Sequence, residues 1–97
     1  MKQDKTPMME MGYQVMHLLL SGRYTAKQLG KMINTNEPTI RKVINNLRCE
    51  GIPVCTGGRG YYISTDKGEI AKTIESLTHR IVQMQNAVDG LMRGMML

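Results

Sequence analysis

The stretch from residue 36 to residue 51 constrains the fold most, because it has the marks of one short helix with a defined start and end. Asn36 is of a type that caps helix N-termini, and Pro38 fits a first helical turn. Gly51 is suited to the left-handed conformation that ends a helix. The helix is expected to bury one apolar stripe, formed by Ile40, Val43, Ile44 and Leu47. Its other face is expected to carry Arg41, Lys42, Asn45 and Asn46.

That polar face carries the donors and acceptors that base edges and phosphates need. It also fits an ordinary surface helix with a solvated face, so the charge around it matters. The net charge is +5, and the segment 21–63 accounts for it with Arg23, Lys27, Lys31, Arg41, Lys42, Arg48 and Arg59 against Glu37 and Glu50. The flanking segments are each balanced in charge. This distribution favours a polyanion partner, with an acidic protein as the alternative.

Composition points to a cytoplasmic protein. The N-terminus is polar, without the long apolar run of a secretory signal, and residues 18–20 are too few to span a membrane. Cys49 and Cys55 have the spacing of neither a redox pair nor a zinc knuckle, so we expect free thiols in a reducing compartment. Ten methionines, with no Trp or Phe, are expected to fill the core in place of aromatic residues.

Two further helices are predicted before residue 36. Residues 1–7 are expected to form a disordered tail, and 8–20 a mostly buried helix. Thr25 is a suitable N-cap for a helix over 26–33, and Asn34 tolerates the left-handed conformation that a tight turn needs. Two short helices joined by a tight turn have the spacing of a helix-turn-helix.

After Gly51 the apolar period changes from helical to alternating. Residues 52–56 and 61–63 predict two strands, joined by a glycine-rich turn over 57–60 with Arg59 at its tip. This turn lacks the Lys-Ser/Thr of a P-loop and opens no helix, so nucleotide binding is not expected. The predicted fold class is mainly α with a small β-hairpin, an α+β arrangement.

Three segments carry a resemblance to a known family: 24–30 (YTAKQLG), 39–48 (TIRKVINNLR), and GIPV at 51–54 followed by GRGYYI at 58–63. Over about residues 8–63 the chain resembles the winged helix-turn-helix family, nearest to the DNA-binding domain of the biotin operon repressor. Asn34 stands where that family usually has Gly. The resemblance implies that 26–33 is the positioning helix, that 36–50 is the recognition helix in the major groove, and that Arg59 is at the wing tip.

From the residues themselves, Arg41 suits guanine, and Asn45 or Asn46 suits adenine. Lys27, Lys42 and Arg59 suit phosphates, while Thr35, Asn36 and Thr39 lie where a helix N-terminus meets a phosphate or a base. The predicted DNA contacts are therefore Thr25, Lys27, Thr35, Asn36, Thr39, Arg41, Lys42, Asn45, Asn46 and Arg59.

The last third predicts a long helix, capped by Thr65 or Asp66 and starting near Lys67. An unbroken heptad seam runs along it, formed by Ile70, Ile74, Leu77, Ile81, Met84, Val88, Leu91 and Met95. β-Branched residues in one set of seam positions favour a parallel two-stranded coil. Few flanking charges specify the register, so a higher oligomer is an alternative to the homodimer. Another alternative is that this helix folds back on its own domain.

These observations predict a disordered tail (1–7), a winged helix-turn-helix domain (8–64) and an oligomerisation helix (65–97). The expected function is sequence-specific binding of double-stranded DNA by a small dimeric regulator of transcription, bacterial or from a phage, associated with the nucleoid. The alternative is an adaptor that binds proteins in a replication or transcription assembly. No catalytic arrangement is discernible, so we expect no enzyme activity, no metal, no cofactor and no membrane partner.

Overall fold

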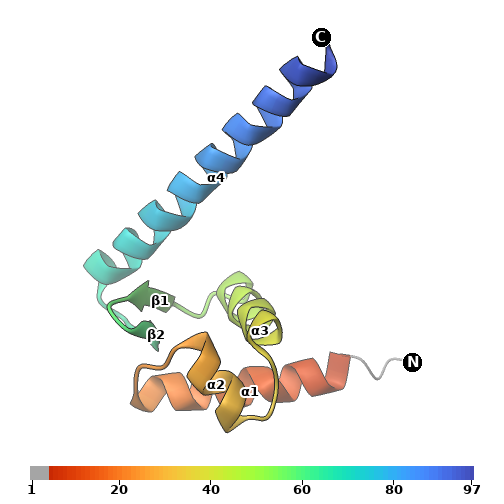
Figure 1. Ribbon diagram of the computed structural model, residues 1–97. Helices are drawn as coiled ribbons and strands as arrows, with labels where there is room; N and C mark the ends of the chain where they lie inside the picture. Colours follow the sequence, from red (N-terminus) through yellow and green to blue (C-terminus); the bar gives the residue numbers. More distant parts are fainter. Residues whose placement is uncertain (1–4) are drawn as a thin grey trace.

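The computed structural model describes residues 5–97. It consists of α1 (Lys5–Ser21), α2 (Ala26–Met32), α3 (Glu37–Cys49), β1 (Val54–Gly57), β2 (Gly60–Ile63) and α4 (Lys67–Met95). Three helices and an antiparallel hairpin form a body from which α4 extends (Figure 1). This confirms the predicted fold class, and the arrangement is compatible with a winged helix-turn-helix.

Helix α1 departs from the prediction in two ways. It begins at Lys5 rather than near Met8, while residues 1–4 of the predicted tail lie outside the described residues. The prediction that it is mostly buried is wrong: Val15 and Leu19 are buried, but Tyr13 and Leu20 are 64% and 65% exposed. The reason is that α1 packs against α3 and β2 along one side and leaves its other side in solvent.

One apolar core joins the three helices to the hairpin. The three helices supply all of its buried residues except one from β1, and the full set is Val15, Leu19, Ala26, Leu29, Ile40, Val43, Ile44, Leu47 and Val54. The predicted apolar stripe of α3 is buried in full, since all four of its residues belong to this core. Methionines Met8, Met11 and Met16 pack at the edge of the core, where they are half-buried.

The start of α2 and the turn between α2 and α3 form as the sequence predicts. The Thr25 hydroxyl accepts a hydrogen bond from the Gln28 N–H, and the Gln28 side chain accepts one from the Thr25 N–H, which completes a capping box. Asn34 adopts the left-handed conformation at φ 60°, and Asn36 caps α3 by accepting from the Thr39 N–H at 2.8 Å. Helix α2 ends at Met32, one residue earlier than predicted.

The hairpin has a tighter turn than predicted. Gly57 and Gly60 pair with each other, so only Gly58 and Arg59 form the turn, and β1 starts at Val54 rather than Ile52. The outer edge of β2 is covered by backbone that precedes α2. Tyr24 N–H donates to the Tyr61 carbonyl at 3.1 Å, and Tyr61 N–H donates to the Tyr24 carbonyl at 2.8 Å. The sequence analysis did not predict this bridge.

Helix α4 is capped by Asp66, whose carboxylate accepts from the Gly68 N–H at 3.0 Å. It packs on β1 near its own N-terminus and then runs away from the body, so the C-terminus lies far from the three other helices (Figure 1). Thr73 is its one buried residue among those described. The alternative in which this helix folds back along its length is therefore wrong. Within residues 5–97, no helix is long and apolar enough to cross a membrane.

Candidate nucleic-acid interface

The polar face of α3 lies on the surface of the body. Arg41, Lys42 and Asn45 are exposed on the side of the helix that turns away from the core. Arg41 forms an ion pair with Glu37 one turn earlier, at 3.1 Å. Both side chains are largely exposed, and such an i,i+4 pair is worth about 0.3–0.5 kcal/mol. A base or a phosphate that binds Arg41 more strongly therefore displaces Glu37 at small cost.

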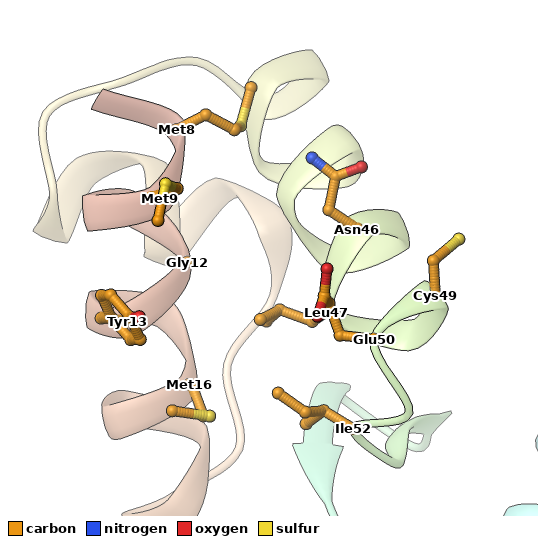
Figure 2. Close-up of a pocket in the computed structure, with 10 residues that line it drawn as sticks. All are labelled: Met8, Met9, Gly12, Tyr13, Met16, Asn46, Leu47, Cys49, Glu50 and Ile52. Atoms are coloured by element: carbon orange, nitrogen blue, oxygen red, sulfur yellow. The ribbon is translucent and has the colours of Figure 1, made fainter. Parts of the chain in front are cut away.

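Asn46 is exposed as well and lies beside a groove between α1 and α3 (Figure 2). The groove has a volume of about 500 Å³. Its walls are mostly apolar and are formed by Met8, Met9, Gly12, Tyr13, Met16, Asn46, Leu47, Cys49, Glu50 and Ile52. Asn45 and Asn46 are both exposed, but only Asn46 lines this groove.

The other predicted contact residues differ in whether their side chains are already engaged or half-buried within the protein, or are exposed at its surface. The side-chain oxygens of Thr25 and Asn36 accept hydrogen bonds within helix caps. Thr35 and Thr39 are half-buried at the turn and in the first turn of α3. The remaining two cations are exposed on separate elements, Lys27 on α2 and Arg59 at the hairpin turn. Among the described residues Arg41–Glu37 is the one ion pair, so neither cation is neutralised by a carboxylate there.

Arg48 extends from the last turn of α3 to the hairpin. Its Nε donates to the Val54 carbonyl at 2.8 Å and a terminal nitrogen donates to the Thr56 hydroxyl at 2.9 Å. The guanidinium also lies 5.8 Å from the centre of the Tyr61 ring. Burial lowers the pKa of Arg48 from its ordinary value, and Arg80 of α4 adds to that lowering. Arg48 thus holds α3 against the hairpin instead of facing solvent.

Arg23 makes a similar contact from the other side of the hairpin. Its guanidinium stacks on the Tyr62 ring at 4.0 Å and donates to the Gly57 carbonyl at 3.2 Å. Desolvation raises the pKa of the Tyr62 phenol, and the nearby Glu69 carboxylate raises it further. Arg23 stays exposed, so its charge remains at the surface next to the turn that carries Arg59.

Sequence reasoning missed the bracing roles of Arg23 and Arg48, which it treated only as part of the basic charge. Their partners lie on the hairpin, which is a separate element, and no helical or strand period signals such contacts. The one available signal was the wheel position of Arg48, at the margin of the apolar stripe rather than on the polar face.

The residues of the predicted oligomerisation seam differ in exposure according to where they lie along α4. Ile70 and Leu77 are half-buried where the helix packs on β1. The other seam residues are exposed by 48–81%, namely Ile74, Ile81, Met84, Val88, Leu91 and Met95. Exposed apolar surface of this extent is typical of interaction sites.

The described residues contain no group of three or more His, Cys, Asp or Glu side chains placed to hold a metal ion. Both thiols are free, with Cys49 exposed and Cys55 buried. The chain matches no protein-family model, no curated protein and no solved structure.

Proposed function

We propose that this protein binds double-stranded DNA in a sequence-specific manner as a homodimer and regulates transcription. The observation that carries the proposal is the exposed Arg41, Lys42 and Asn45 face of a helix whose opposite face is fully buried. In this proposal, α2 and α3 form a winged helix-turn-helix of the kind found in the biotin operon repressor, α3 enters the major groove, and Arg59 reaches the backbone or minor groove from the wing.

The roles of individual side chains follow from their chemistry. Arg41 binds guanine with two hydrogen bonds, and Asn45 binds adenine in the same way. Lys27, Lys42 and Arg59 bind phosphates and supply affinity that does not depend on sequence. Asn46, at the edge of the groove beside α1, has a smaller part than its neighbour. Pairing of the exposed seam of α4 in two copies would give an inverted-repeat site with half-sites about one helical turn apart.

Fluorescence anisotropy with random duplex DNA over a salt series tests the proposal, with the solution mass measured on the same sample. Three phosphate-binding cations in each of two copies give an expected slope of log K against log salt of about −5. Selection from a random duplex library then identifies the preferred site. Absence of binding at low salt by a folded, oligomeric protein would contradict the proposal.

A second candidate function is a protein-interaction adaptor in a replication or transcription assembly. The observation that favours it is the apolar groove beside the charged face of α3, because protein interfaces combine an apolar centre with a polar rim. In this function the basic residues contact an acidic protein. Competition separates the two functions, since excess duplex DNA would leave an adaptor complex intact.

A further inference from the structure

Three side chains connect α3 to α4 across the hairpin. Arg48 of α3 donates to the Thr56 hydroxyl at 2.9 Å and to the Val54 carbonyl at 2.8 Å. On the same strand, the Thr56 N–H donates to the Thr73 hydroxyl of α4 at 3.2 Å. Thr56 thus contacts both helices, through its side chain on one and its backbone on the other.

The strand that carries Thr56 is itself held in place. Thr56 pairs with Tyr61 of β2, and Tyr61 exchanges two backbone hydrogen bonds with Tyr24 on the opposite edge of the hairpin. Both edges of the two-stranded sheet are therefore occupied, one by Tyr24 and the other by Arg48 and Thr73. Because β1 is held in this way and contacts both helices, it fixes the orientation of α4 relative to α3.

Thr73 is the point where α4 is attached to the body. It is 6% exposed and is the one buried residue of that helix among those described. Ile70 and Leu77, one turn before and one turn after it, are half-buried on the same side. Beyond Thr73 the helix continues for about 33 Å to Met95 at 1.5 Å per residue, so a tilt of about 10° at Thr73 changes the position of its far end relative to the body by about 6 Å.

We propose that the Arg48–Thr56–Thr73 junction fixes the angle between the recognition helix and α4, and so sets the spacing of the two DNA half-sites. The spacing part rests on the proposed function. When two α4 helices are paired, a loose junction lets each body swing about Thr73 and shifts its recognition helix relative to the pair, so several spacings are allowed. Thr56 and Thr73 are positioning residues that touch no DNA.

The test compares wild-type protein with Thr73→Val, which keeps the side-chain shape and removes the acceptor for the Thr56 N–H. Thr78→Val is the matched control, because Thr78 is exposed on the same helix. Affinity is measured for duplexes that carry the selected half-site as an inverted repeat, with the spacing changed one base pair at a time, and for a single half-site. Circular dichroism confirms that each variant is folded.

Wild type and Thr78→Val are expected to prefer one spacing at least tenfold over spacings two base pairs away. In Thr73→Val this preference should fall to about threefold or less, with single half-site affinity unchanged. An unaltered spacing preference in Thr73→Val would overturn the proposal. Loss of single half-site binding would also overturn it, because the threonine would then support the DNA-binding surface itself.

A second measurement needs no DNA. Spin labels at exposed Cys49 of α3 and at Gln83→Cys of α4 report their separation within one chain, when labelled protein is diluted into unlabelled protein. We expect a narrow distance distribution that broadens in Thr73→Val and in Arg48→Lys, but not in Thr78→Val. Distance distributions of equal width in wild type, Thr73→Val and Arg48→Lys would refute the proposal that the junction fixes this angle. If wild type binds no duplex while the distribution broadens as expected, the proposed function fails and the junction stands.

Discussion

Gly60 allows the hairpin to approach the backbone before α2, so replacing it with alanine is a sharp test of the fold. Its φ is 139°, in the range that favours glycine. A Cβ built on Gly60 would lie 2.4 Å from the Tyr24 carbonyl oxygen and 2.8 Å from the Thr25 nitrogen. Both are backbone atoms that cannot rotate away. Gly60→Ala must therefore break the two Tyr24–Tyr61 hydrogen bonds or distort the turn.

The expected loss of stability is the sum of the backbone strain and the two lost hydrogen bonds. Backbone strain costs about 1–3 kcal/mol. Each of the two hydrogen bonds contributes about 1 kcal/mol net. We expect Gly60→Ala to lower the free energy of unfolding by about 3–5 kcal/mol, a large share of the 5–15 kcal/mol typical of a domain.

Gly51→Ala is the matched control. Gly51 also has a positive φ, at 93°, but a Cβ there would meet nothing within 4 Å. Its loss should be about 1–2 kcal/mol, from conformation alone. Urea unfolding followed by circular dichroism, at one protein concentration for all three proteins, measures both losses. If the two variants lose the same stability within about 0.5 kcal/mol, the close approach to Tyr24 contributes nothing and the reasoning is refuted.

Four further results are expected. Lys42→Ala should reduce the magnitude of the salt slope of DNA binding by about 2 for a dimer, because one phosphate contact is lost in each copy. Asn45→Ala should weaken binding to the preferred site by about 1–3 kcal/mol and relax discrimination at one base pair, as measured by competition with substituted duplexes. Ile81→Lys with Val88→Lys should give monomers in sedimentation equilibrium, since both residues lie on the exposed seam. Cys49 should react rapidly with a thiol reagent in the native protein and slowly when DNA is bound, because it lies on the exposed side of α3.

Three of these results have a control within the chain. Lys72→Ala removes a cation from α4 and should leave the salt slope unchanged if α3 is the DNA surface. Ser76→Lys places a charge outside the seam and should leave the mass unchanged. Buried Cys55 should react only on unfolding. Equal effects of Lys72→Ala and Lys42→Ala, or a dimer that persists with both seam lysines, would contradict the respective assignments.

Local chemistry explains why much of this fold was predictable. The caps at Thr25, Asn36 and Asp66 and the left-handed Asn34 depend on residues within a few positions, and each forms as the sequence indicates. The buried stripe of α3 follows from its period alone.

Contacts between distant segments were not predictable in the same way. The Tyr24–Tyr61 bridge and the Thr56–Thr73 hydrogen bond depend on how separate elements pack, which no local pattern encodes. The apolar residues of α1 predicted a mostly buried helix, yet too little structure packs on that helix to cover Tyr13 and Leu20. At the site, a helical wheel put Asn46 with Asn45, whereas the packing of α1 puts it beside the groove.

The bridge between Tyr24 and Tyr61 also has a consequence for the order of folding. A two-stranded hairpin alone is marginally stable in water, and this one gains its third partner from the connection between α1 and α2. The three helices supply all but one of the buried residues of the apolar core, and the hairpin adds only Val54. We therefore expect the helices to associate first and the hairpin to close last. During synthesis, the helix-turn-helix would then emerge before the wing that completes it.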